Sequence, residues 1–279
     1  MQIFKEIAPL KHFLRQERSK QKSIGLVPTM GAIHQGHLNL VRIAKAENQT
    51  VVSSIYINPT QFNNSTDLEK YPRTFEKDVE LLESAGCDVM FYPDNKEMYA
   101  SPSSLKFDFG MIDKVLEGAF RPGHFSGVAL VVSKLFNIAE PDKAYFGQKD
   151  FQQFRIISQL VDELKFNIKL VCVPTMREAD GLAMSSRNLR LKGDERKRAL
   201  VLFESLNYAK EEIKKTSLPQ IREVVKNNCA MLNVKLEYLE LADSSNLSIL
   251  DNVKDNVRAI LLMAAYVGEI RLIDNLFVE

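Results

Sequence analysis

Short apolar runs alternate with amphipathic segments through the first two-thirds of the chain, a pattern typical of alternating strands and helices. The apolar runs predict buried strands at 24–28, 50–56, 89–92, 143–146 and 169–173. Helical spacing of apolar residues predicts helices between them at 37–48, 74–85, 126–139 and 151–164. This alternation indicates an α/β fold with a mostly parallel sheet covered on both faces. Because such folds bind ligands at the carboxyl ends of their strands, we expect the chemistry in the loops there.

The pattern changes after about Pro174. A loop rich in charged and small residues, 177–188, leads into a long helical stretch at 194–215, and a second helix follows Pro219. Strands are then expected at 234–241, 257–266 and 269–274. Two helices followed by strands indicate a small α+β domain. We therefore predict two domains, 1–175 and 176–279, with the boundary near 173–176.

Composition and charge narrow the class of protein. Hydrophobic residues make up 45% of the 279, enough for a buried core, and 37 basic residues nearly balance 36 acidic ones. We expect no nucleic-acid partner, because gripping a phosphate backbone usually takes a basic face. The three cysteines lie far apart without metal-ligand spacing, which favours reduced thiols in a cytoplasmic protein. The sequence shows no signal peptide and no apolar run of ~20 residues, so we expect no membrane span.

The strongest functional signal is the loop after the first predicted strand, where 28–37 reads Pro-Thr-Met-Gly-Ala-Ile-His-Gln-Gly-His. His34 and His37 flank Gly36 at the expected start of a helix, where backbone amides and the helix dipole favour an anion. Two imidazoles could donate hydrogen bonds to a triphosphate as charge develops. The alternative is a turn histidine and a helix-capping histidine. Of the other histidines, His12 is expected on the surface of an N-terminal helix, and His124 stays open.

Two further segments carry chemistry suited to phosphate. Lys149, in Gly147-Gln-Lys-Asp150, is expected at a helix start, where its charge opposes the dipole unless an anion lies between them. The alternative is a solvated lysine in a turn. Met184-Ser-Ser-Arg-Asn188 pairs two small hydroxyl groups with a planar bidentate cation, which suits a phosphate clamp. Together with the histidine loop, these segments predict a phosphate-transfer site.

Several motifs of other enzyme classes are missing from the sequence. It contains no Gly-x-x-x-x-Gly-Lys-Ser/Thr loop, no Gly-x-Gly-x-x-Gly fingerprint and no Gly-x-Ser-x-Gly nucleophile elbow. No Cys–His pair is evident either. The chemistry therefore needs no covalent enzyme nucleophile, which is consistent with direct attack of a substrate carboxylate on the α-phosphorus of ATP.

Taken together, these motifs resemble the pantothenate synthetase (pantoate–β-alanine ligase) family of the nucleotidyltransferase superfamily. The resemblance covers nearly the whole chain and includes the strings 28–37, Asn58-Pro-Thr-Gln-Phe, Tyr71-Pro-Arg, Arg121-Pro-Gly-His-Phe-Ser-Gly, Gly147-Gln-Lys-Asp-Phe-Gln-Gln, the long Arg177-Glu-Ala-Asp-Gly-Leu-Ala-Met-Ser-Ser-Arg-Asn and 267–275. It departs from the family at Ile33, where leucine is more usual, and at Gln148, where glutamate is common. Neither side chain is essential to the implied roles.

The resemblance implies a two-step reaction. Pantoate would attack ATP to give pantoyl adenylate and pyrophosphate, and β-alanine would then displace AMP. The implied catalytic residues are His34, His37 and Lys149. The implied ATP-binding residues are Met30, Gly31, His34, Gly36, His37, Gly147, Lys149, Asp150, Met176, Met184, Ser185, Ser186 and Arg187. Gln61 and Gln153 would bind pantoate, because a side-chain amide can donate and accept hydrogen bonds at the same time.

The resemblance also implies an architecture and partners. The region 1–175 would be a Rossmann-like domain that binds ATP and pantoate, and 176–279 a small lid that excludes water from the adenylate. Mg²⁺ is expected to bridge phosphate oxygens without a metal site built from protein ligands. A homodimer is expected through the N-terminal domain. Arg121 and His124 stay open between dimer contacts and the substrate channel.

Three alternative functions share parts of this pattern. A nucleotidyltransferase acting on a phosphate acceptor would share the histidine loop without needing Gln61 and Gln153. An aminoacyl-tRNA synthetase fragment shares the two phosphate motifs, but the balanced charge and the lack of an RNA-binding extension speak against it. A nucleotide sensor would bind ATP without turnover, yet every catalytic residue type that the reaction needs is present.

Overall fold

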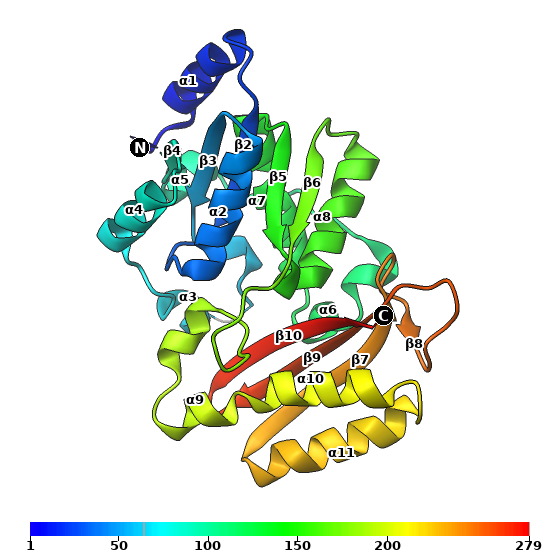
Figure 1. The fold of residues 1–279 in the computed structure, drawn as a ribbon. Helices are drawn as coiled ribbons and strands as arrows, with labels where there is room; N and C mark the ends of the chain where they lie inside the picture. The colour runs from blue at the N-terminus through cyan, green and yellow to red at the C-terminus, as the bar shows by residue number, and fades with distance from the viewer. Residues whose placement is uncertain (64, 279) are drawn as a thin grey trace. The chain divides into compact units, whose positions relative to one another are not determined.

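A computed structural model describes residues 1–63 and 65–278 (Figure 1). The chain divides into two compact units. The first comprises Met1–Gly147 and Ile156–Pro174, and the second comprises Gln148–Arg155 and the residues from Thr175 onward. The division falls within α8 (Phe151–Leu164). The predicted boundary at 175, and the predicted roles of a nucleotide-binding domain and a lid, stay predictions. None of the helices in the described ranges has both the length and the apolar character needed to cross a membrane.

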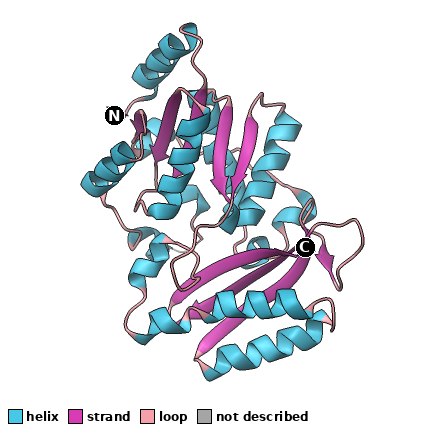
Figure 2. Ribbon diagram, in the orientation of Figure 1, coloured by secondary structure: helices cyan, strands magenta, loops and turns pink. Residues whose placement is uncertain are grey.

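The first unit contains a six-stranded sheet in which every pair of neighbouring strands is parallel (Figure 2). The strand order is β1-β4-β3-β2-β5-β6. The strands are β1 (Gln2–Phe4), β2 (Ile24–Thr29), β3 (Thr50–Ile55), β4 (Val89–Phe91), β5 (Lys143–Gly147) and β6 (Lys169–Val173). The five predicted strands and the α/β fold class are confirmed. The edge strand β1 was not predicted, because three residues, two of them exposed, are too few for a periodic signal.

Helices cover both faces of this sheet because each presents one apolar stripe. In α2, Leu38, Val41 and Ala44 are buried at helical spacing and join a core shared with the sheet and α4. On the opposite face α7 packs against β2 and α1 (Figure 1). The helices and 3₁₀ turns of this unit are α1 (Ile7–Ser19), α2 (Gln35–Glu47), η1 (Pro59–Gln61), α3 (Ser65–Glu69), α4 (Phe75–Ser84), α5 (Asn95–Met98), η2 (Gly110–Asp113), α6 (Glu117–Phe120) and α7 (His124–Ala139).

The strand order reverses between β2 and β5. From β2 the chain moves outward through β3 to β4, and it then returns to the other side of β2 to form β5 and β6. Strands β2 and β5 are neighbours and pair in parallel. In open α/β sheets such a reversal leaves a crevice at the carboxyl ends of the two strands, where ligands bind. The histidine loop follows β2, and the segment with Lys149 follows β5.

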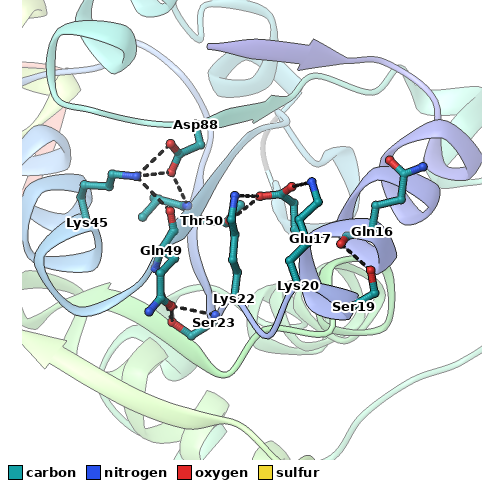
Figure 3. A network of polar contacts seen from close by, with 11 residues as sticks. Gln16, Glu17, Ser19, Lys20, Lys22, Ser23, Lys45, Gln49, Thr50 and Asp88 are labelled. Atoms are coloured by element: carbon teal, nitrogen blue, oxygen red, sulfur yellow. Dashed lines mark hydrogen bonds and ion pairs between the residues drawn. The ribbon is translucent and has the colours of Figure 1, made fainter.

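A network of charged side chains lies by the amino ends of β2 and β3 (Figure 3). The Glu17 carboxylate accepts hydrogen bonds from Lys20 Nζ at 2.8 Å, Lys22 Nζ at 2.5 Å and Thr50 Oγ1 at 3.3 Å. The hydrogen bonds from the two lysines lower the pKa of Glu17 to about 2. This network lies at the end of the strands away from the loops that carry the predicted chemistry, and it anchors α1.

The second unit contains a four-stranded antiparallel sheet with the order β10-β9-β7-β8. Helices α10 and α11 pack against this sheet and against each other, and together they enclose a separate apolar core. The elements of this unit are η3 (Gln148–Asp150), η4 (Ser186–Arg190), α9 (Asp194–Arg198), α10 (Val201–Glu212), α11 (Leu218–Met231), β7 (Val234–Asp243), β8 (Ile249–Leu250), β9 (Ala259–Val267) and β10 (Ile270–Val278). The predicted α+β character is confirmed.

The single long helix predicted at 194–215 is wrong. Residues Ala199 and Leu200 interrupt it, and the chain forms α9 and α10 instead. At the interruption the backbone N–H of Leu200 bonds the carbonyl of Lys197, three residues back, so the chain tightens into a 3₁₀-type turn. The apolar periodicity continues through that turn, which is why the sequence pattern does not reveal it. The last strand also runs farther than predicted, from Ile270 to Val278.

Candidate active site

The turn after β2 adopts a conformation that few residues tolerate. Gly31 has φ of +82° and Ala32 has φ of +49°, both in the left-handed region. Glycine takes up this conformation freely, whereas alanine does so at a cost of roughly 1–2 kcal/mol. The Thr29 hydroxyl accepts the N–H of Gly31 at 3.3 Å and donates to the Ser54 carbonyl of β3 at 2.7 Å. The turn is therefore tied to the neighbouring strand.

A buried carboxylate from α4 holds the same turn. Asp78 is 2% exposed, and its two oxygens accept the N–H groups of Ala32 at 3.0 Å and of Ile33 at 2.8 Å. The Thr74 hydroxyl donates to the same carboxylate at 3.0 Å. Hydrogen bonds to a charged group are stronger than those between neutral groups. The bonds to Asp78 therefore offset the free-energy cost of the left-handed backbone in the turn. Asp78 was not predicted, because nothing in its local pattern distinguishes it from a surface residue of an acidic helix.

The two histidines of the loop lie against each other at the N-terminus of α2. Their ring centroids are 3.9 Å apart, with the ring planes at 29°. His34 is the N-cap of α2, and its Nδ1 accepts the N–H of Gly36 at 3.1 Å. Accepting through Nδ1 means that the proton of the neutral ring is on Nε2. His34 thus caps the helix, which was the alternative interpretation, and the same bond makes its Nε2 a donor group at a helix N-terminus.

Gln61 ends the 3₁₀ turn that follows β3, and it lies against the histidine loop. Its Nε2 donates to Met30 Sδ at 3.0 Å, and its Oε1 accepts from Asn58 Nδ2 at 3.1 Å. Asn58 is 1% exposed and also accepts from Tyr99 at 2.9 Å. The structure thus brings the predicted residues Met30 and Gln61 together. Asn58 was part of a quoted string, but its role as the support of Gln61 is visible only in three dimensions.

Helix α7 packs against η1, the 3₁₀ turn that contains Gln61. His124 is 6% exposed, and its Nδ1 lies 2.7 Å from the carbonyl oxygen of Gln61. The carbonyl of Gly127, one turn along α7, accepts from Asn58 Nδ2 at 3.1 Å. A Cβ atom at Gly127 would lie 2.3 Å from the carbonyl oxygen of Thr60, so only glycine permits this approach. His124, whose role the sequence left open, contacts the backbone of a predicted substrate-binding residue.

A cavity of about 790 Å³ in the first unit opens beside the turn that follows β2. That volume falls in the range of small-molecule sites, about 300–1,000 Å³. Met30 and Gly31 line it together with Tyr56, Arg73 and Asp78. The Tyr56 hydroxyl donates to Asn95 Oδ1 at 2.8 Å, and burial raises the pKa of Tyr56, so the phenol stays neutral and a donor. Arg73 belongs to the quoted string Tyr71-Pro-Arg and adds a cation to the wall.

In the second unit, Lys149 lies in η3 between β5 and the first turn of α8. Its side chain is 16% exposed, and Nζ lies 3.3 Å from the carboxylate of Asp150. Gln153 is half-buried on the first turn of α8. The Asn275 side chain donates to the carbonyl oxygens of Gln148 and Lys149 at 3.0 and 2.9 Å. Asn275 was part of the string 267–275, but these contacts could not be predicted, because the bonds join residues more than a hundred positions apart.

The residues predicted as a phosphate clamp form a loop closed on itself. The N–H of Met184 bonds the carbonyl of Met176 at 3.0 Å, which joins the two ends of the loop. The Ser185 hydroxyl accepts the N–H of Arg187 at 3.2 Å and caps η4. Ser186 is buried at 8% exposure. The structure therefore brings Met176, Met184, Ser185, Ser186 and Arg187 together within the second unit.

Comparison with known proteins identifies relatives over the whole length of the chain. The profile of the family described as pantoate-beta-alanine ligase matches residues 2–277. The pantothenate synthetase of Cytophaga hutchinsonii is 46% identical over 275 residues, which cover 98% of this chain and 97% of the relative. That of Porphyromonas gingivalis is 45% identical over 281 residues, with both chains covered completely.

Solved structures agree with these relatives. The crystal structure of pantothenate synthetase from Thermus thermophilus superimposes with a TM-score of 0.90 at 39% identity, covering 99% of both chains. The pantoate-beta-alanine ligase of Francisella tularensis, complexed with beta-gamma ATP and beta-alanine, gives a TM-score of 0.84 at 36% identity, covering 99% of this chain and 97% of that one.

Proposed function

The chain belongs to the pantoate–β-alanine ligase family, and we propose that the residues described above divide the work of that reaction among them. The protein is an ATP-dependent ligase that condenses pantoate with β-alanine to pantothenate, releasing AMP and pyrophosphate. ATP is therefore a co-substrate. The predicted family, fold and activity are confirmed.

The proposed reaction has two steps. A carboxylate oxygen of pantoate attacks the α-phosphorus of ATP, and the bond from that phosphorus to the bridging oxygen breaks, so pyrophosphate leaves with the electron pair. The amine of β-alanine then attacks the acyl carbon of the adenylate. The bond from that carbon to the phosphate oxygen breaks, AMP leaves, and the amine loses its proton as the amide forms. No enzyme nucleophile takes part.

One observation carries the assignment of the first step, namely the stacked His34–His37 pair at the N-terminus of α2. The backbone N–H groups and the dipole at the N-terminus of α2 favour an anion there. Because Nδ1 of His34 caps the helix, its Nε2–H is directed by the fold as a donor for a phosphate oxygen. His37 is the candidate acid that assists the departure of pyrophosphate. Gly31 and Gly36 permit close approach of the triphosphate, and Met30 borders the nucleotide.

Lys149 is proposed to neutralise charge at the α-phosphate in the transition state, where such help counts most. Its side chain is 16% exposed, and its ammonium has a single nearby carboxylate, Asp150, among its described contacts. Mg²⁺ is part of the proposal. The half-exposed Asp150 carboxylate is an oxygen ligand of the kind that Mg²⁺ prefers, and the remaining ligands would be phosphate oxygens and water. When bound, the ion supplies charge neutralisation between the phosphates. Gly147 is the last residue of β5, and the segment that carries Lys149 begins directly after it.

The loop of the second unit from Met176 to Arg187 is proposed to close over the nucleotide. Ser185, Ser186 and Arg187 offer hydroxyl, amide and guanidinium donors in one short turn, a set that suits phosphate. Met184 would close over the triphosphate with them, and Met176, which Met184 joins by a backbone hydrogen bond, would lie near the adenine. A lid role for the region 176–279 follows from the same assignment.

Gln61 and Gln153 are proposed to bind pantoate through its hydroxyl groups and carboxylate. The support for Gln61 is its position next to Met30, the bond from Asn58 to its side-chain oxygen and the contact of His124 with its backbone carbonyl. A bound pantoate would replace the weak sulfur acceptor of Met30 with an oxygen.

We also propose a homodimer, on the strength of the family resemblance, and a cytoplasmic location, in keeping with three free thiols.

The test measures AMP and pantothenate formed from ATP and Mg²⁺ with pantoate, with and without β-alanine. Sustained AMP formation that requires both acids, with pantothenate as product, supports the full reaction. Exchange of labelled pyrophosphate into ATP in the presence of pantoate alone tests the adenylate. ATP binding without exchange or AMP would refute the proposed adenylation.

A further inference from the structure

The C-terminal strand β10 carries two neighbouring buried polar residues, Asp274 and Asn275, which are 4% and 1% exposed. They end the sequence string 267–275, to which the reaction assigns no role. Both lie in a strand paired along its whole length with β9, so their backbone positions are fixed by the sheet. A buried polar side chain in such a rigid place is normally fully hydrogen-bonded, and its partners indicate what it holds.

The partners of Asn275 belong to the segment of Lys149. Its Nδ2 donates to the carbonyl oxygens of Gln148 and Lys149, at 3.0 and 2.9 Å. Its Oδ1 accepts from Gln148 Nε2 at 3.1 Å. Both N–H groups and the oxygen of the amide are thus engaged, and all three bonds go to two consecutive residues. Asn275 fixes the backbone of η3 on both sides of the Cα atom of Lys149.

The neighbouring residue of β10, Asp274, holds the loop that was assigned to the triphosphate. Arg177 makes a bidentate ion pair with Asp274, with N–O distances of 2.6 and 2.9 Å. Arg177 also donates to the carbonyl of Gly181 at 3.0 Å. One pair of adjacent strand residues therefore anchors two segments, η3 and the start of the loop 177–188. These contacts all lie within the second unit.

The position of the Lys149 ammonium depends on this anchor. A lysine side chain has four rotatable bonds and a strongly hydrated head, so its own geometry specifies little. Electrostatic help in a transition state falls steeply with misplacement, and an error of about 1 Å can cost roughly 10²-fold in rate. The backbone from which Lys149 extends must therefore be held by a group that does not move with it. Asn275 on β10 meets that requirement.

We propose that Asn275 is a positioning residue for Lys149. Its side-chain amide holds η3 so that the ammonium meets the phosphate, and it touches no substrate itself. The inference rests on the role proposed for Lys149 in adenylation. It also gives the string 267–275 a function and the side-chain amide of Gln148 a partner, Asn275 Oδ1.

The test is a double-mutant cycle of Asn275→Ala and Lys149→Ala, read as kcat for AMP formation and as KM for ATP. Asn275→Ala should lower kcat by about 10–100-fold while changing KM for ATP by less than ~3-fold. In the Lys149→Ala background, the same substitution should lower kcat by less than ~3-fold, because the group that it positions is already gone.

A matched control separates positioning from stability. Asn48 is also a buried asparagine, 6% exposed, and its Nδ2 donates to the Ala44 carbonyl at 2.8 Å and the Tyr145 hydroxyl at 2.7 Å. Asn48→Ala should lower the unfolding temperature but keep kcat within ~2-fold of the parent. If Asn275→Ala does not fold, Gln148→Met removes only the bond to Asn275 Oδ1. It should give a smaller loss of kcat that also vanishes in the Lys149→Ala background.

Two outcomes would overturn the inference, and they can be told apart. If Lys149→Ala alone leaves AMP formation unchanged, the proposed role of Lys149 fails and the inference falls with it. If Lys149→Ala lowers the rate but the effect of Asn275→Ala is the same in both backgrounds, Lys149 keeps its role and Asn275 is structural only.

Discussion

The substitution Asp78→Asn measures how firmly the turn before the histidine pair is held. Asp78 is almost completely buried and accepts the N–H groups of Ala32 and Ile33, at 3.0 and 2.8 Å. Asparagine has nearly the same shape, but one acceptor oxygen becomes an NH₂ group. That group would face a backbone N–H, donor against donor, in a place closed to water.

The expected loss in the free energy of unfolding follows from these contacts. A hydrogen bond to a charged group contributes about 1.5–3 kcal/mol, and a buried N–H left without an acceptor costs about 1–3 kcal/mol. The two effects overlap, so the free energy of unfolding should fall by about 2–4 kcal/mol. Ala32 adds to the effect on function, because its left-handed backbone, at φ of +49°, relaxes once the bonds that hold it weaken. The turn carries His34, so KM for ATP should rise roughly tenfold.

Urea unfolding followed by far-UV circular dichroism gives the stability, since the chain contains no tryptophan. Initial rates of AMP formation give KM for ATP. Glu17→Gln is the matched control, because Glu17 is another buried carboxylate of the first unit that accepts several hydrogen bonds (Figure 3). The control should lose stability without a change in KM. A stability loss below ~0.5 kcal/mol in Asp78→Asn would show that the carboxylate does not hold the turn. A full loss with an unchanged KM would show that the turn does not govern ATP binding.

Three further predictions test other parts of the molecule. His37→Ala and Lys149→Ala should each lower pyrophosphate exchange by roughly 10²–10³-fold in a folded protein, and full activity in either would contradict the assigned role. Gly127→Ala places a Cβ 2.3 Å from a carbonyl oxygen of η1, so the Gln61 turn must shift. KM for pantoate should rise more than KM for ATP, and equal changes would refute the link to Gln61. The pKa of Glu17 is lowered to about 2 by its lysine partners, so its contribution to stability is fully present above the ordinary value of 4.5 and is lost as the pH falls toward 2. Urea midpoints between pH 4.5 and 2 should therefore fall more steeply for the parent than for Glu17→Gln, and parallel curves would contradict the pairing.

Local pattern predicts most of the elements and suggests a chemistry for each loop. The five central strands and most of the helices follow from periodicity, because burial on one face imposes it on every residue of an element. The His-Gln-Gly-His loop points to phosphate because its residue types and its place between a strand and a helix can be read along the chain. The helix predicted at 194–215 shows the limit of prediction from local pattern. The turn at Ala199 and Leu200 leaves the apolar spacing intact and so leaves no trace in the pattern.

The residues that hold these loops in place are decided by the tertiary structure alone. Asp78 lies 46 positions beyond Ala32, His124 lies 63 beyond Gln61, and Asn275 lies 126 beyond Lys149. Each is a buried polar side chain whose role depends on partners from another element, and no spacing along the chain encodes those partners. The sequence by itself therefore determined the fold class and the residue types on which the proposed chemistry rests. Only the fold decided which groups fix their positions, because the hydrogen bonds that do so form between strands and helices brought together by packing.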